Sequence, residues 1–504
     1  MLGSCTKAPD RPVAFAPGEA RPGVFERPAG VASDAPLRTW HGKAITLRTD
    51  SDERYALALV QKLDSFLAQA NAELSRVLDV PMRRVAATIV VFEEQDRYQR
   101  HARRNAPGLI NNGGYYDGST RTVVTYRFNN SMQLFFHELV HAVMAEQFQD
   151  HHFSRYTRSN WPIWFDEGMS EYLGSYAVEG GGIRIPAPNK GKLAYLSNAL
   201  THRAFVPLRT LLTAPASRFS GSSMNIYYAE SWGLMDYLVH HVVHRSQVPL
   251  FFRKVRAGED GLAAFQHCFG RDLAAFESSW LAHIRRTVRP PRRPVALFSG
   301  HSIDDWTVHE GGQWDVKDGA IVGRGDKHYN YLIKSEVPLR DFTFELDMML
   351  EDGTAGLILG NNYHGEYPYY YLVDVARDAV MLRRSYTATR IVPVKQAFAD
   401  IALGKWVHLA VTVLDRTISV SVDGREVMVT RSDRESYSLF GLYLYHARAR
   451  FKNARLSRER RELPGWARKH AVVRPGGAGA PAASPGGPVS PLRTHRPSPR
   501  APAF

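Results

Sequence analysis

The sequence predicts a multidomain protein in which an α+β domain precedes an all-β antiparallel jelly-roll sandwich. At 504 residues, the chain exceeds the roughly 100 to 200 residues of a typical domain. Before about residue 286, apolar residues at helical spacing are mixed with short strand-like runs. After Pro294, short alternating strands are separated by turn signals such as Asp318-Gly319 and Asp423-Gly424. The apolar content of 44% excludes a fibrous or fully disordered chain.

Composition divides the chain into five segments. We expect a disordered N-terminal linker over residues 1–37, the α+β domain over 38–286, an Arg/Pro linker over 287–294, the sandwich over 295–460 and a disordered basic tail over 461–504. The flanking segments are rich in Pro, Gly, Ala and Arg, and they lack an apolar period, so they offer little surface that a core could bury.

The net charge of +14 lies mainly outside the predicted domains. Residues 453–504 contain ten Lys or Arg and two Glu, and residues 285–294 contain five Arg and no acid. The remaining chain is therefore close to neutral. This distribution favours a solvated linker and tail over a nucleic-acid surface, and we expect no nucleic-acid partner.

The first residues resemble the end of an export signal. Leu2-Gly3-Ser4-Cys5 has the form of the end of a bacterial lipobox, whose cysteine becomes lipid-modified, although the charged and apolar regions of a signal peptide do not precede it. We expect an exported, periplasmic or lipid-anchored protein, with a chance match as the alternative. No window reaches the ~18 apolar residues of a membrane helix, so no transmembrane span is expected.

The first half of the α+β domain follows a strand, helix, strand, hairpin order. Residues Ala44–Leu47 and Ala86–Phe92 are typical of strands, and Glu53–Leu78 carries apolar residues at helical spacing. Tyr115–Phe128 predicts a hairpin that turns at Asp117-Gly118. We expect its second arm to form a sheet edge along which an extended peptide can pair.

The most specific motif is HELVH, from His137 to His141. Two histidines at positions i and i+4 share one helical face and can bind one Zn²⁺, and Glu138 lies beside them as a candidate general base. Asn130 and Ser131 are candidate caps for this helix.

A third ligand is expected from a second helix. Met144 and Gln147 occupy the positions at which a metzincin carries its downstream Gly and His, which excludes that class. The segment WPIWFDEGMSEY instead predicts a helix from about Pro162 that presents Glu167 and, one turn later, Glu171 on one face. Here the sequence resembles the gluzincin metallopeptidases, the peptidase MA-like group, in which HExxH precedes a helix with an EGxxE/D-Y motif.

The resemblance implies a zincin-like fold and a role for each of these residues. His137, His141 and Glu167 would hold Zn²⁺, and Glu171 would orient a ligand imidazole. The 25 residues between His141 and Glu167 exceed the spacing in the aminopeptidase branch. The insert contains two alternative ligands, His151 and His152.

A tyrosine completes the resemblance. Tyr228 lies in the segment YYAESWGLMDYL, similar to the gluzincin helix whose Tyr donates a hydrogen bond to the developing oxyanion; Tyr227 is the alternative. The implied reaction is peptide hydrolysis by a metal-activated water with Glu138 as general base.

The second domain resembles the concanavalin A-like, laminin G-like sandwiches, and especially the 3-keto-disaccharide hydrolase-like branch. The resemblance rests on phrases such as DDWTVHEGGQWDVKDGAIVGRG and GKWVHLAVTVLDRTISVSVDGREV. It implies carbohydrate or surface-polymer binding. Tyr363, Tyr367 and Tyr369 are candidate glycan-binding residues, with ordinary packing as the alternative. Glu345 and Asp347 share one strand face and form a candidate carboxylate pair for glycoside chemistry, with a simple solvent-facing position as the alternative.

Three hypotheses for the function remain. The first is a zinc metallopeptidase that acts on a peptide or protein and carries a lectin-like module for a glycan or cell surface. The second is a catalytically inactive scaffold that keeps the zincin fold. The third is a carbohydrate hydrolase that acts through the sandwich.

Overall fold

The computed structural model describes residues 35–83, 85–107, 113–127, 132–148, 162–179, 182–219, 224–289, 293–309, 311–325, 329–361, 370–386 and 390–459. Over these ranges the chain is multidomain, with an N-terminal α/β part and a C-terminal antiparallel β sandwich. Most of the expected N-terminal linker, the basic tail and Cys5 lie outside the described residues. No helix in the described ranges is long and apolar enough to cross a membrane.

The α/β part is built on a five-stranded sheet in the order β1-β2-β3-β5-β4. Strands β2, β3 and β5 are parallel, while β1 and β4 pair antiparallel at the two edges. Helix α1 connects the parallel strands β2 and β3, as a parallel pair requires. The strands are β1 (Arg38–His41), β2 (Ile45–Thr49), β3 (Ala87–Phe92), β4 (Gly114–Asp117) and β5 (Thr122–Tyr126).

The predicted hairpin forms, but its second arm is not a sheet edge. Strand β5 pairs antiparallel with β4 on one side and parallel with β3 on the other, so the expectation of a peptide-binding edge at residues 121–128 is wrong. The sequence TVVTY suits this central place, because a strand with neighbours on both sides buries β-branched and aromatic side chains. The edge is β4.

Helix α1 (Glu53–Leu78) coincides with the predicted helix. The Asp52 side chain accepts a hydrogen bond from the Tyr55 amide at its start, and the chain turns into the left-handed region at Asp79, with φ 51°, at its end. The Phe66 ring stacks on Phe136 of the next long helix, with ring centroids 4.0 Å apart. This contact fixes α1 against the helix that carries HELVH.

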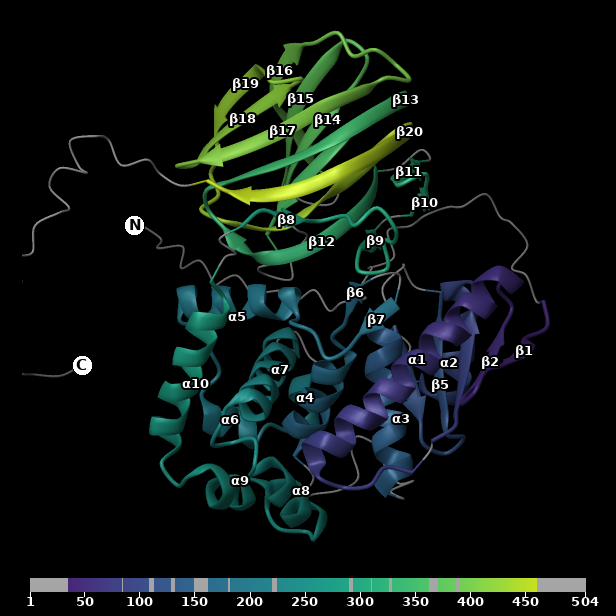
Figure 1. Ribbon diagram of the computed structural model, residues 1–504, viewed down its shortest axis with the longest axis vertical. Helices are drawn as coiled ribbons and strands as arrows, with labels where there is room; N and C mark the ends of the chain where they lie inside the picture. The colour runs from purple at the N-terminus through teal and green to yellow at the C-terminus, as the bar shows by residue number, and fades with distance from the viewer. Residues whose placement is uncertain are drawn as a thin grey trace, which may run out of the picture. The chain divides into compact units, whose positions relative to one another are not determined.

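The remainder of the α/β part is mainly helical, with one short hairpin (Figure 1). Its elements are α2 (Gln95–Asn105), α3 (Gln133–Phe148), α4 (Ile163–Gly174), β6 (Ala177–Glu179), β7 (Gly182–Arg184), α5 (Lys190–His202), α6 (Leu208–Leu212), the 3₁₀ helix η2 (Ala216–Phe219), α7 (Met224–His240), α8 (Val248–Arg256), α9 (Gly261–Phe269) and α10 (Leu273–Thr287).

The sandwich is organised by two long strands, β13 and β20, which pair along their length (Figure 1). The first half of β13 pairs with β17 and its second half with β14. Strand β13 therefore takes part in both sheets of the sandwich, and so does its partner β20. The register shifts between residues 350 and 354 mark the change of sheet. The strands are β8 (Val295–Ala296), β9 (Thr307–His309), β10 (Gln313–Lys317), β11 (Ala320–Arg324), β12 (Tyr329–Leu339), β13 (Phe342–Gly360), β14 (Tyr370–Val375), β15 (Ala379–Ser385), β16 (Ile391–Phe398), β17 (Trp406–Leu414), β18 (Thr417–Val422), β19 (Arg425–Arg431) and β20 (Tyr437–Arg458).

Candidate metal centre

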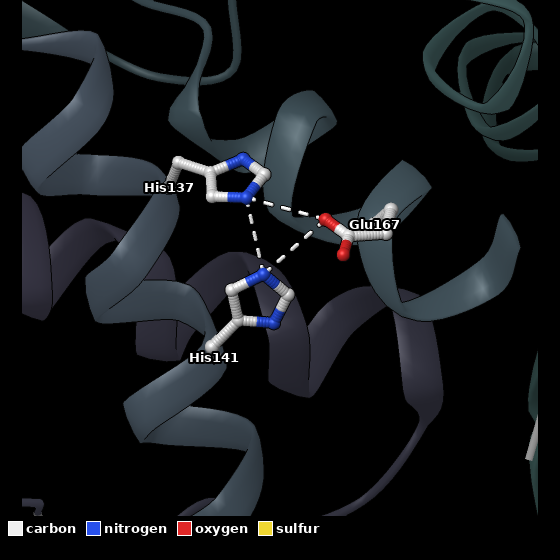
Figure 2. A group of neighbouring side chains, drawn as sticks. All are labelled: His137, His141 and Glu167. Atoms are coloured by element: carbon white, nitrogen blue, oxygen red, sulfur yellow. Dashed lines mark hydrogen bonds and ion pairs between the residues drawn. The ribbon is translucent and has the colours of Figure 1, made fainter. Parts of the chain in front are cut away.

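Helices α3 and α4 bring together three side chains that can ligate a metal. His137 and His141 lie one turn apart on α3, Glu167 comes from α4, and all three side chains point toward a common centre (Figure 2). The two Nε2 atoms are 3.1 Å apart, and Glu167 Oε2 lies 3.3 Å from Nε2 of His137 and 3.4 Å from that of His141. The predicted ligands therefore form a compact triangle.

The triangle has the size that a small divalent cation requires. Ligand atoms bound tetrahedrally at about 2.0–2.1 Å are separated by about 3.3–3.4 Å. The observed separations of 3.1, 3.3 and 3.4 Å match this value. All three residues are buried, so the helix packing holds the triangle in place.

Each imidazole has a carboxylate beside its other ring nitrogen. Asp166 Oδ2 and Ser170 Oγ lie 3.2 Å from Nδ1 of His141, and Glu171 Oε1 lies 3.6 Å from Nδ1 of His137. A carboxylate at this nitrogen fixes the tautomer and directs Nε2 at a metal. Glu171 thus lies where the resemblance implies, whereas Asp166 was not identified from the sequence. Its position directly before Glu167, the first residue of the EGxxE motif, is the signal that could have found it.

Glu171 is held by a buried network. Lys192 Nζ of α5 donates to its Oε1 at 2.9 Å, and Gln133 Nε2 of α3 donates to its Oε2 at 3.2 Å. Lys192 and Glu171 are both buried, and a charge pair in such a place needs additional hydrogen bonds. Sequence analysis missed Lys192 because only the tertiary fold brings α5 to this site.

The electrostatic environment of the centre stabilises positive charge. Burial lowers the pKa of His141, but the carboxylates of Asp166 and Glu167 outweigh it and raise that pKa to about 10. The same negative charge that holds a proton on this imidazole attracts a cation to the triangle.

The candidate catalytic residues lie close to the ligands. Glu138 is buried on α3, directly after His137. The Tyr228 ring lies edge-on to the His137 ring, with centroids 6.0 Å apart. Tyr227 is 5% exposed and packs against Phe219. The alternative tyrosine is therefore a core residue, and Tyr228 is the one beside the centre.

A glycine lets α4 approach α7. A Cβ at Gly168 would lie 2.7 Å from the Ser231 carbonyl oxygen and 2.8 Å from Met235 Cγ. Gly168 thus has a packing role, because it allows α4, which carries Glu167, to lie close to α7.

Several other predicted site residues are not among those that the structure describes. The alternative ligands His151 and His152 lie outside the described residues, as do Tyr363, Tyr367 and Tyr369 and the candidate caps Asn130 and Ser131.

The carboxylate pair of the sandwich is engaged by neighbouring side chains. His408 lies between the two acids, with Nδ1 2.9 Å from Asp347 Oδ1 and Nε2 3.2 Å from Glu345 Oε2. Arg455 donates to Glu345, and Asn453 donates to Asp347. This arrangement is a surface ion-pair network on β13, β17 and β20.

Comparisons with solved structures return sugar-related proteins of low overall similarity. A carbohydrate-binding module, CBM66 from Bacillus subtilis, is 24% identical over 30% of this chain and 96% of its own, with a TM-score of 0.27. A putative glycosyl hydrolase from Parabacteroides distasonis is 14% identical over 33% of this chain and 94% of its own, with a TM-score of 0.25. A β-1,3-1,4-glucanase from a mouse hindgut metagenome is 9% identical over 32% and 98%, with a TM-score of 0.26.

No curated protein matches the chain. A family model matches part of it. The matched residues begin at 293, so they cover the sandwich and do not include the metal-ligand triangle. The expected 3-keto-disaccharide hydrolase-like character of the second domain is confirmed, because residues 293–457 match the model of the 3-keto-alpha-glucoside-1,2-lyase-like domain.

Proposed function

We propose that this protein has two functional sites, a carbohydrate site in the sandwich and a zinc-dependent peptidase centre in the α/β part. The family match over residues 293–457 supports the carbohydrate function. The ligand triangle of α3 and α4 supports the metal-dependent function, which rests on geometry alone. The two proposals are independent, so each has its own experiment.

The observation that carries the peptidase proposal is the triangle formed by His137, His141 and Glu167. Two imidazoles and one carboxylate are a donor set typical of catalytic zinc, which keeps one position open for water or substrate. A zinc ion held there would supply the positive charge that polarises a peptide carbonyl.

The side chains around the triangle divide the remaining work. Glu138 takes a proton from the attacking water and passes it to the leaving amine nitrogen as the C–N bond breaks. Tyr228 donates a hydrogen bond to the carbonyl oxygen as negative charge develops on it. Asp166 and Glu171 keep the imidazoles of His141 and His137 oriented.

Among the described strands, β4 is the edge of the sheet on the side of the hairpin. Strand β4 pairs with β5 on one side and ends the sheet on the other. An extended chain can add to such an edge through backbone hydrogen bonds. We assign the substrate strand to β4 in place of residues 121–128.

Metal content and cleavage, measured together, test the peptidase centre. Wild type and Glu138→Gln should both bind one zinc per chain by atomic emission, while casein cleavage by the variant falls by about 10²–10⁴-fold because the base is lost. Glu179→Gln, which alters an exposed carboxylate paired with Arg184, is the matched control and should cleave like wild type. Zinc binding without cleavage by wild type would favour the inactive scaffold. Absence of zinc in wild type would exclude the metal centre.

The carbohydrate function is tested on the same proteins. Full-length wild type and Glu138→Gln are incubated with a 3-keto-α-glucoside, and release of the aglycone is followed by chromatography. Equal release by both proteins would assign a carbohydrate activity to a site that does not use Glu138. Binding without release would instead identify a carbohydrate-binding module.

A further inference from the structure

The sandwich carries an unusual polar cluster on the outside of one of its sheets. We call it the Asp374 face and define it by Tyr329, Tyr331, Asp374, Arg383, Tyr443 and Tyr445. These residues lie on strands β12, β14, β15 and β20. Tyr331 and Tyr443 belong to an apolar cluster separate from the core between the sheets, which contains the neighbouring Leu332 and Leu442. Side chains alternate between the two faces of a strand, so the Asp374 face lies opposite the sandwich core.

Sheet register sets this face in one row. Tyr331 is paired with Tyr443, Tyr443 with Gly356, and Gly356 with Asp374, across four neighbouring strands. Gly356 leaves the space between Tyr443 and Asp374 without a side chain. No other residue fits there, because a Cβ would lie 1.9 Å from the Val373 carbonyl oxygen.

A buried carboxylate lies at the end of this row. Asp374 is 2% exposed and forms an ion pair with Nε of Arg383. The guanidinium side chain remains 25% exposed, and its Nη1 donates to the Tyr329 hydroxyl at 2.9 Å. Burial raises the pKa of Asp374 to about 6, against the opposing effects of Arg383 and the Tyr443 hydroxyl.

The cluster has a physical cost that packing alone does not explain. Replacing a buried ion pair with apolar residues of similar volume is often neutral or stabilising. An apolar or small-residue surface would therefore serve the sheet at least as well. Groups of this kind concentrate at functional sites.

We infer that the Asp374 face binds a sugar ring, an inference that rests on the proposed carbohydrate function of the sandwich. Sugar hydroxyls both donate and accept hydrogen bonds, which suits the part-exposed Arg383 guanidinium and the Tyr329 hydroxyl beside it, while the buried Asp374 holds the guanidinium in place. The rings of Tyr329 and Tyr445 are half-buried, with centroids 4.9 Å apart, and give an aromatic surface for the apolar face of a pyranose. Arg383 connects the buried carboxylate to the aromatic surface, because it contacts both Asp374 and the Tyr329 hydroxyl.

The opposite outer face provides a matched control. It holds another arginine–carboxylate pair, Arg455 with Glu345, on β20 and β13. The Arg455 side chain is 58% exposed, so this pair is an ordinary surface ion pair.

Calorimetric titration of the full chain with sucrose and with 3-ketosucrose tests the inference. For whichever sugar wild type binds, Arg383→Gln should weaken the affinity by at least about tenfold, because charged hydrogen bonds are lost. The control variant Arg455→Gln should bind that sugar like wild type. Tyr445→Ala, which removes a half-exposed ring, should also weaken binding, and it serves if Arg383→Gln fails to fold by circular dichroism.

The possible failures can be told apart. Wild-type affinity in both Arg383→Gln and Tyr445→Ala would overturn the Asp374 face as the site while leaving the carbohydrate function in place. Equal losses in Arg383→Gln and Arg455→Gln would also overturn it. If wild type binds neither sugar, both the inference and the carbohydrate function are wrong.

Discussion

Asp166 is a buried carboxylate beside the candidate metal centre. Its Oδ2 lies 3.2 Å from Nδ1 of His141, and it is 3% exposed. A buried carboxylate at this position stabilises the cationic state of the site and fixes the ring that must present Nε2 to a metal. In the proposed centre Asp166 would therefore act through His141.

Removing this charge should weaken metal binding. We expect Asp166→Asn to lower zinc affinity by about 10–100-fold, because the imidazole loses its orienting partner and the site loses negative charge. Competition with a chromophoric chelator measures the affinity. The control is Asp236→Asn, which alters another aspartate that contacts imidazoles, those of His240 and His283. Equal losses in the two variants would contradict a specific role for Asp166.

Asp374 should make the stability of the sandwich depend on pH. Its pKa is about 6 in the folded state and near 4 in the unfolded chain, so its contribution to stability is full below pH 4 and is lost as the pH rises through 6. The loss is about 3 kcal/mol at most. Urea unfolding of wild type and Asp374→Asn across pH 4 to 7 measures the difference. Asp347, whose pKa is lowered by hydrogen bonds to His408 and Asn453 despite opposing burial, should show the opposite sign.

At the scale of elements, the packing of α4 on α7 positions Glu167. Gly168 follows Glu167, and the α7 backbone lies so close to this glycine that an added methyl group would be 2.7 Å from the Ser231 carbonyl oxygen. The position of the Glu167 carboxylate relative to the two histidines therefore depends on the distance between α4 and α7. An element that packs at such short range transmits small shifts directly to the site.

A methyl group at Gly168 should destabilise the domain although alanine is the better helix former. The helix propensity gain is about 1 kcal/mol, whereas overpacking costs about 1–3 kcal/mol or more when backbone must move. We expect Gly168→Ala to lower the free energy of unfolding and to weaken zinc binding. Gly182→Ala, where the nearest atom would be 3.7 Å away, should leave both unchanged. A Gly168→Ala variant more stable than wild type would contradict the packing role.

At the scale of the whole molecule, the α/β part and the sandwich each have a large apolar core. The first core is formed chiefly by the sheet and helices that carry the metal ligands, and the second lies between the two sheets of the sandwich. A ligand that binds one folded domain stabilises that domain by mass action.

Zinc should stabilise the folded α/β part. At a free zinc concentration of about 100 times Kd, its free energy of unfolding should rise by about 2.7 kcal/mol. Differential scanning calorimetry with zinc or with a chelator measures the shift, and His141→Ala should show none. A zinc-dependent shift in this variant would mean that the metal binds elsewhere.

The sequence alone was most informative where the signal is local. The helix at residues 53–78 was predicted to both ends, because its apolar period lies within one continuous segment. The three side chains of the candidate metal centre were also named from sequence, since HELVH and Glu167 belong to short motifs whose spacing reflects helix geometry, and the structure brings them together.

Tertiary structure decided the features that depend on distant segments. The edge of the first sheet passed from residues 121–128 to β4 because β5 also pairs with β3, a parallel contact made by a crossover. Lys192 reached Glu171 only through the packing of α5. Asp374 contacts Arg383 and lies beside the tyrosines because of the register across several strands. Pairing between remote strands leaves no local period in the sequence, so the order of side chains across a sheet had to come from the fold.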